Sequence, residues 1–218
     1  MRPIPPRPRP AGVVLDGRYA RLEPLGAAHA PALHQASAAP GAESRFAYLF
    51  DQPPGAPADT EAWIAKMTAG DDPLFSAVID KASGRAEGRQ ALMRIVPEHG
   101  VIEIGHILWG PAISRRRAAT EALYLAARYV FEDLGYRRFE WKCHNANEPS
   151  KAAARRFGFS FEGLFRQHMW AKGANRDTAW FSMLDSEWPG FRREYDRWLA
   201  AANFDAAGNQ LTTLSLRA

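Results

Sequence analysis

The chain has 218 residues, 46% of them hydrophobic, which suits one globular domain with a substantial core. Its 28 Lys and Arg residues face 24 Asp and Glu residues, and the net charge of +4 fits anionic ligands as well as nucleic acid. A single cysteine, Cys143, excludes an intrachain disulfide framework, and because the sequence has neither a signal-peptide core nor about 18 consecutive apolar residues, we expect a cytoplasmic protein that does not contact a membrane.

The N-terminal part of the chain predicts an arm, a hairpin and a helix. Residues 1–12 are rich in proline and arginine, a composition typical of a disordered arm. Apolar segments at 13–15 and 19–25 flank an Asp-Gly pair and predict a short hairpin. An alanine-rich helix is expected over 27–38.

A long loop is predicted over residues 40–58, and it contains Phe46, Tyr48 and Phe50. Long loops in compact domains are commonly functional. The aromatic residues either form one wall of an acceptor pocket or belong to a strand fragment packed on the domain, and the sequence leaves both interpretations open. A helix capped by Asp59 or Thr60 should follow the loop.

The central part of the chain predicts strands at 74–80, 89–96 and 101–109, a helix at 116–134 and a strand at 138–143. In this helix an apolar stripe should face the core, with Glu121 and Tyr124 on the opposite, polar side. Because a strand–helix–strand crossover joins parallel neighbours, the strand at 138–143 should pair in parallel with the strand at 101–109.

The C-terminal part predicts a helix at 148–157 capped by Asn147, a hairpin with strands at 159–172 and 178–184, and a helix at 187–201. We therefore expect one α+β domain over residues 13–201, followed by a loose tail over residues 202–218.

An arginine-rich segment at 114–120, Ser-Arg-Arg-Arg-Ala-Ala-Thr, leads from a strand into the start of the long helix. A helix start carries unpaired backbone N–H groups and the positive end of the helix dipole, and both attract an anion. Arginine is unfavourable beside that dipole unless an anion is bound, so the segment predicts a diphosphate-binding site. The alternative is a solvated, basic first turn.

Three more residues are candidates for catalysis or binding. Glu103 lies in the apolar strand at 101–109, where burial would raise the pKa of its carboxyl and suit it to general-base catalysis, unless it lies at an exposed strand end. Asn147 and Ser150 either contact a ligand or only cap a helix. The six histidines and Cys143 lack the spacing of a metal site, so no metal is expected.

Five segments carry a family pattern: IEIG at 102–105, SRRRAATEAL at 114–123, FEDLGYRRFEW at 131–141, NEPSKAAARRFGF at 147–159 and FEGLFR at 161–166. Together they resemble the GNAT superfamily of acetyl-CoA-dependent N-acetyltransferases, and within it the Rim-type branch, which acetylates ribosomal-protein N-termini. The resemblance implies a mixed, mostly antiparallel sheet flanked by helices, in which a parallel strand pair splays apart around acetyl-CoA.

The resemblance also implies roles for individual residues. Contacts to the coenzyme diphosphate fall on Ser114, Arg115, Arg116, Arg117, Ala118, Ala119 and Thr120. Contacts to its pantetheine arm and acetyl group fall on Leu108, Trp109, Asn147 and Ser150. Glu103 falls near a family glutamate that activates the amine. Ser150 is a candidate donor to the leaving thiolate, because Ala154 stands where many members have a tyrosine. Apart from the resemblance, the aromatic residues Phe46 and Tyr48 of the long loop and His144 at the end of the strand at 138–143 are candidate acceptor contacts.

Arg115 and Arg117 depart from the family pattern because glycine is usual at both positions. If the loop requires a positive φ there, arginine costs about 1 kcal/mol or more. If the position is already helical, arginine is tolerated.

The sequence thus predicts an N-acetyltransferase that transfers an acetyl group directly from acetyl-CoA to the amine of a protein N-terminus or a small molecule. Two alternatives stay open: a protein of this fold that binds acyl-CoA without turnover, and a basic nucleic-acid-binding module, which the basic pI and the arginine clusters at 7–9 and 115–117 suggest and which ranks lower. A homodimer is also left open.

Overall fold

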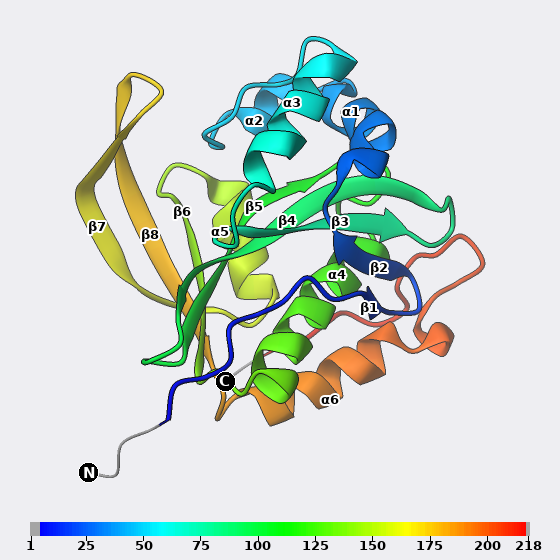
Figure 1. Ribbon diagram of the computed structural model, residues 1–218. Helices are drawn as coiled ribbons and strands as arrows, with labels where there is room; N and C mark the ends of the chain where they lie inside the picture. Colours follow the sequence, from blue (N-terminus) through cyan, green and yellow to red (C-terminus); the bar gives the residue numbers. More distant parts are fainter. Residues whose placement is uncertain (1–4, 217–218) are drawn as a thin grey trace.

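An eight-stranded sheet forms the centre of the computed structural model, which describes residues 5–216 (Figure 1). The strands are β1 (Leu15–Asp16), β2 (Ala20–Pro24), β3 (Leu74–Asp80), β4 (Arg85–Val96), β5 (Val101–Trp109), β6 (Arg138–His144), β7 (Ser160–Ala171) and β8 (Ala174–Leu184). They lie in the order β1-β2-β3-β4-β5-β6-β8-β7, and all neighbours are antiparallel except the parallel pair β5–β6. The predicted fold class and the predicted parallel pair are both confirmed.

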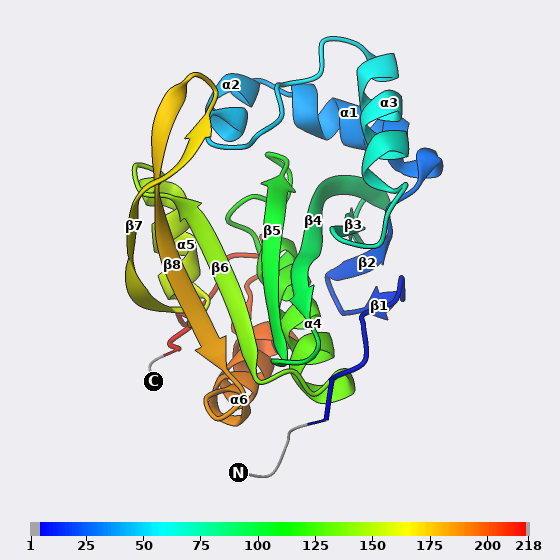
Figure 2. The same ribbon diagram turned by 60° about the vertical axis from the view of Figure 1, so that its left-hand side comes forward.

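Helices cover both faces of this sheet (Figures 1 and 2). They are α1 (Ala30–Ala38), α2 (Ala42–Phe46), α3 (Pro57–Met67), α4 (Arg117–Arg128), α5 (Glu148–Arg156) and α6 (Trp188–Leu199), with short turns η1 (Ala27–His29), η2 (Tyr129–Asp133, of π type) and η3 (Ala201–Asn203). Within residues 5–216, none of the helices combines the length and the apolar character that a bilayer crossing needs.

The two faces of the sheet enclose separate apolar cores. Ile102 and Ile104 of β5 pack toward α4 and α6 in the larger core. Leu33, Ile64 and Phe75 belong to the smaller core under α1 and α3. Since side chains alternate along a strand, Glu103 points to the face opposite its two isoleucine neighbours.

Helix α4 is buried on all sides, which corrects the polar face expected for it. Glu121 is 4% exposed and accepts hydrogen bonds from the backbone N–H groups of Arg18 (2.9 Å), Tyr19 and Ala20 (2.7 Å) in the β1–β2 turn. The Tyr124 hydroxyl donates to Asp196 on α6 (2.6 Å). The helix lies between the sheet and α6, so side chains on its predicted polar side find partners inside the protein.

The arm predicted to be disordered over residues 1–12 follows the domain surface from Arg7 onward. The Arg7 N–H donates to the Pro97 carbonyl oxygen (3.0 Å), and the Ala11 N–H donates to the Tyr129 hydroxyl (3.0 Å). These bonds fix the extended backbone that its prolines favour. Residues 1–4 of the predicted arm lie outside the described residues.

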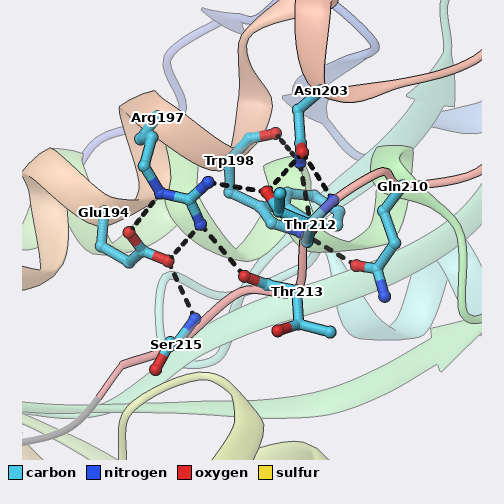
Figure 3. A network of polar contacts seen from close by, with 8 residues as sticks. All are labelled: Glu194, Arg197, Trp198, Asn203, Gln210, Thr212, Thr213 and Ser215. Atoms are coloured by element: carbon cyan, nitrogen blue, oxygen red, sulfur yellow. Dashed lines mark hydrogen bonds and ion pairs between the residues drawn. The ribbon is translucent and has the colours of Figure 1, made fainter.

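The C-terminal segment is also packed, in contrast to the loose tail predicted over residues 202–218 (Figure 3). Asn203, 7% exposed, donates to the Trp198 carbonyl oxygen (2.9 Å) and accepts from the Thr212 N–H (2.9 Å). Trp198 Nε1 donates to Gln210 Oε1 (2.9 Å). Arg197 bonds both Glu194 and the Thr213 carbonyl oxygen, so the segment is tied to the end of α6. The last two residues of the predicted tail lie outside the described part of the chain.

Smaller differences lie at element boundaries. The predicted loop over 40–58 contains helix α2. Helix α3 begins at Pro57, and Asp59 is the third residue of its first turn, where its carboxylate accepts the N–H groups of Gly55 and Ala56. Strand β4 begins at Arg85, four residues before its predicted start, because the turn before it is tight.

Candidate functional site

Strands β5 and β6 diverge about halfway along their length (Figure 2). Only residues Val101–Ile104 of β5 pair with β6, through its residues Arg138–Trp141. Just beyond this point β5 contains a bulge, in which His106 and Ile107 lie opposite the single residue Gln90 of β4. His106 has φ 51°, a backbone conformation that is uncommon outside glycine. A bulge bends its strand, so β5 turns away from β6 and leaves a V-shaped opening.

A first cavity of about 260 Å³ occupies this opening. Among the residues that line it are several of the predicted site residues: Tyr48, Glu103, Leu108, Trp109, Ser114, His144, Asn147 and Ser150. The rings of Tyr48 and His144 lie 5.1 Å apart. The structure therefore brings together residues that are far apart in the sequence.

Phe46 does not line this cavity, contrary to its predicted role as an acceptor contact. It is 3% exposed and faces a separate cavity of about 350 Å³ bounded by Leu33, Thr60 and Trp63. Helix α2 turns its ring inward under α1. Its carbonyl oxygen accepts from Lys172 Nζ (2.9 Å) at the tip of the β7–β8 hairpin, so α2 and the hairpin meet beside the first cavity.

Glu103 is 5% exposed and forms a charge cluster with the buried side chains of Lys142 and Glu140 and with the exposed Arg94. Its Oε2 lies 2.9 Å from Lys142 Nζ and 3.3 Å from Arg94 Nε, and Lys142 Nζ also lies 2.7 Å from Glu140. Burial raises the pKa of the Glu103 carboxyl, and the neighbouring Lys142 ammonium partly opposes that rise. Glu103 is therefore a stronger base than an exposed glutamate.

Asn147 and Ser150 hold the start of α5 at the edge of the first cavity. Asn147 Oδ1 accepts the Ser150 N–H (3.1 Å), which confirms its predicted capping role. Ser150 Oγ accepts from Trp141 Nε1 (3.0 Å). Because an indole N–H can only donate, the Ser150 hydroxyl hydrogen is not used in that bond, and it lies within reach of the Cys143 sulfur.

Cys143 also lines the first cavity, and burial raises the pKa of its thiol. A thiol of raised pKa is a poor nucleophile at neutral pH. Over residues 5–216 the structure contains no group of three or more His, Cys, Asp or Glu side chains arranged to hold a metal ion.

A second cavity of about 550 Å³ lies at the start of α4. The predicted diphosphate segment lines it through Ser114, Arg115, Arg116, Arg117, Ala119 and Thr120. Ala118 is 4% exposed, and its side chain packs into the larger core instead. No side chain caps the N-terminus of α4, so the N–H groups of its first turn lack a side-chain partner. Trp109, Ser114 and Ala153 line both cavities, which therefore adjoin each other.

The two arginines that replace family glycines differ in conformation. Arg115 has φ 60°, so it adopts the left-handed conformation at a cost of about 1–2 kcal/mol. Arg117 is the first residue of α4 and carries no such strain. Its guanidinium lies over the rings of Tyr19 (4.2 Å) and Phe204 (5.1 Å).

The family described as an acetyltransferase (GNAT) domain matches residues 20–160. The chain belongs to the GNAT family of acetyltransferases. Enzymes of this family use acetyl-CoA as co-substrate, and the family membership predicted from the sequence is confirmed at the level of the superfamily.

Three relatives illustrate the similarity of this GNAT acetyltransferase to known proteins. A crystal structure of a GCN5-related N-acetyltransferase from Brucella melitensis is 61% identical, with a TM-score of 0.95 over 97% of this chain and 96% of that one. An uncharacterized N-acetyltransferase, p20, from Bacillus licheniformis is 32% identical over 118 residues, 52% of this chain and 64% of p20. The putative ribosomal N-acetyltransferase YdaF from Bacillus subtilis is 36% identical over 62 residues, 28% of this chain and 34% of YdaF. The matched part of the chain thus spans less than two thirds of each of these curated relatives.

The structure of this GNAT domain also adds cavity residues that the sequence did not indicate. Arg156 of α5 lines the second cavity, and its Nη1 donates to Thr120 Oγ1 (3.0 Å). Phe204, Gly208 and Gln210 reach the same cavity from the C-terminal segment. Arg156 could have been found from its place less than two turns after Ser150 on α5, whereas the C-terminal segment carries no sequence signal.

Proposed function

We propose that this GNAT acetyltransferase transfers an acetyl group from acetyl-CoA directly to the primary amine of a protein N-terminus or of a small molecule. One observation carries the proposal: the cavity at the start of α4 adjoins the cavity in the opening between β5 and β6, and the buried carboxylate of Glu103 lines the latter.

The residues around the second cavity fit a coenzyme diphosphate. The unpaired N–H groups of the first turn of α4 supply donors, and Arg115, Arg116 and Arg156 supply positive charge around them. In this proposal the diphosphate contacts residues 114–120, and the pantetheine arm passes between Leu108–Trp109 and the start of α5 at Asn147.

Glu103 would act as the general base. A protonated amine cannot attack a thioester, so it must first lose a proton, and a buried carboxylate of raised pKa is suited to accept one. A backbone N–H of Leu108 or Trp109 would donate to the acetyl carbonyl oxygen, where negative charge develops. Ser150 would donate its hydroxyl hydrogen to the departing thiolate sulfur.

We further propose membership of the Rim-type branch, which favours a protein N-terminus as acceptor. The family pattern in the sequence and the name of the relative YdaF support this proposal. A small-molecule amine is the alternative acceptor.

The test combines calorimetric titration with coenzyme A and an assay of thiol release from acetyl-CoA with and without amines. The proposal expects coenzyme A to bind and amines to accelerate thiol release. Binding without amine-dependent release would instead favour an acyl-CoA-binding protein, and salt-sensitive binding of nucleic acid without coenzyme binding would favour the nucleic-acid alternative.

Arg115→Glu is the variant that probes the diphosphate contact. Reversing this charge should weaken coenzyme A binding about tenfold, or about 1.4 kcal/mol. Arg193→Glu is the matched control, because Arg193 is exposed on α6 and lines neither cavity. Equal affinities for the two variants would remove Arg115 from the site.

A further inference from the structure

Arg176 on β8 is a buried cation without a counter-ion. It is 8% exposed and lines the first cavity. Its Nε donates to Thr178 Oγ1 (3.3 Å), and its guanidinium lies 5.0 Å from the ring centre of Phe50. In the part of the chain that the structure describes, no carboxylate forms an ion pair with it.

Asp177, the acidic residue next to Arg176 in the sequence, points away from the Arg176 guanidinium. Asp177 follows Arg176 on the strand and therefore points to the other face of the sheet. Its Oδ1 accepts the Gln167 N–H (2.8 Å) and an Asn175 side-chain N–H (2.8 Å). Asp177 thus stabilises the hairpin and does not neutralise the Arg176 guanidinium.

The other charged groups around the first cavity already have partners. Glu103 is its acidic lining residue, and it is paired with Lys142 and Arg94. Arg45 donates to the Pro40 carbonyl oxygen (2.8 Å) and so holds the end of α1. Arg176 remains as the cation whose terminal nitrogens have no protein partner among the described residues.

Such an arrangement is costly unless a ligand completes it. A guanidinium cannot readily lose its proton, and a charge held away from bulk water without a counter-ion is destabilising. Burial here lowers the pKa of Arg176, and the nearby Cys143 and Glu103 side chains partly oppose that change. The guanidinium geometry matches a carboxylate through two parallel N–H···O bonds.

We propose that the acceptor carries a carboxylate near its amine and that Arg176 binds this carboxylate. The inference rests on the proposed function, because it places the acceptor in the first cavity with its amine toward Glu103. Polyamines and other purely cationic amines are then poor acceptors. The carboxylate belongs either to a free amino acid or to an acidic side chain at a peptide N-terminus.

The experiment compares acceptor pairs that differ only in this charge. One pair is L-phenylalanine and its amide, which tests an α-carboxylate. The other is the amidated dipeptides Asp-Phe and Asn-Phe, which tests an acidic side chain. For each pair, kcat/KM is measured for the wild type, Arg176→Gln, Arg176→Lys and the control Arg166→Gln, whose exposed side chain on β7 lies outside the cavity. The preference of a protein is its kcat/KM for the carboxylate acceptor divided by its kcat/KM for the neutral acceptor of the same pair. Differences in intrinsic amine reactivity cancel when the preference of a variant is divided by that of the wild type.

We expect the carboxylate acceptor of at least one pair to be favoured about tenfold or more by the wild type, and the pair that shows it identifies the source. Arg176→Gln should abolish this preference, Arg176→Lys should retain part of it, and Arg166→Gln should keep it. Affinity for coenzyme A should be the same in all four proteins. Absence of a preference in both pairs, or its full retention in Arg176→Gln, would overturn the inference.

A binding measurement separates this inference from the proposed function. The N-acetylated Asp-Phe and Asn-Phe amides are titrated into the protein with coenzyme A present, so that no turnover is needed. Tighter binding of the Asp compound that depends on Arg176 supports the inference even if no amine is acetylated, in which case only the proposed function fails. Turnover without any carboxylate preference overturns the inference alone.

Discussion

Replacing Glu103 with glutamine tests the chemistry of the site with little change in shape. The side chain keeps its length, but it can no longer accept a proton at neutral pH. General-base catalysis contributes roughly 10²–10⁴-fold to enzymatic rates. We therefore expect kcat to fall at least about 100-fold, which corresponds to about 3 kcal/mol of lost transition-state stabilisation. Affinity for coenzyme A should not change, because Glu103 does not line the second cavity.

Glu140→Gln is a matched control for Glu103→Gln, because both glutamates contact Lys142. Glu140 lies beside Glu103 in the strand register and shares Lys142 with it, at 2.7 Å against 2.9 Å. Glu140 does not line the first cavity. Its substitution perturbs the same ion cluster without removing the proposed base, so kcat should stay within a few-fold of the wild type.

Glu103→Gln also has a predictable effect on the stability of the protein. Because burial raises the pKa of Glu103 in the folded protein, the unfolded chain releases this proton first as the pH rises. Below the ordinary pKa of glutamate, Glu103 is protonated in both states, and its titration does not change the free energy of unfolding. Above that pH its titration lowers the free energy of unfolding, increasingly so until the pH passes the pKa of Glu103 in the folded protein. Glu103→Gln removes this unfavourable contribution, and Lys142 keeps Glu140 as its partner. At pH 7 the variant should be at least as stable as the wild type in urea denaturation.

Steady-state thiol release across pH completes the test. In the wild type, kcat/KM should rise with pH through an acidic limb whose midpoint lies above the ordinary pKa of glutamate, followed by the deprotonation of the amine itself. Glu103→Gln should lose the acidic limb. A variant with wild-type kcat, or a loss of rate equal to that of Glu140→Gln, would refute the assignment of Glu103 as base.

Two further substitutions test the other parts of the account. Ser150→Ala should slow thiol release about tenfold at saturating substrate with unchanged coenzyme A affinity, if its hydroxyl protonates the thiolate; an unchanged rate would leave that role to solvent. Glu121→Ala removes the carboxylate that accepts hydrogen bonds from three backbone N–H groups, and each such bond is worth about 1.5–3 kcal/mol. It should lower the free energy of unfolding by about 3 kcal/mol or more in urea, and a loss below about 1 kcal/mol would contradict the role assigned to that carboxylate.

Local pattern was enough to predict the elements that build the opening. The strands at 74–80 and 101–109 have the predicted boundaries, because their apolar runs end at turn residues. The parallel partner of β5 followed from the strand–helix–strand order alone. The segment at 114–120 also lies at a helix start, as its composition indicated.

Other features depend on tertiary contacts that no local pattern encodes. Helical periodicity placed Glu121 on a polar face, but the β1–β2 turn covers that face and supplies its hydrogen-bond donors. Phe46 belongs to a helix in what looked like a loop, which turns its ring away from the first cavity. The C-terminal segment reaches the second cavity through hydrogen bonds centred on Asn203, and such polar networks have no periodic signature.

A crystal structure with bound coenzyme A tests the central claim most directly. The account predicts the diphosphate against the N–H groups that begin at Arg117, and the pantetheine arm between β5 and β6 beyond Ile104 and Trp141, with its thiol end toward Glu103. Coenzyme bound elsewhere, or a diphosphate remote from the start of α4, would contradict it.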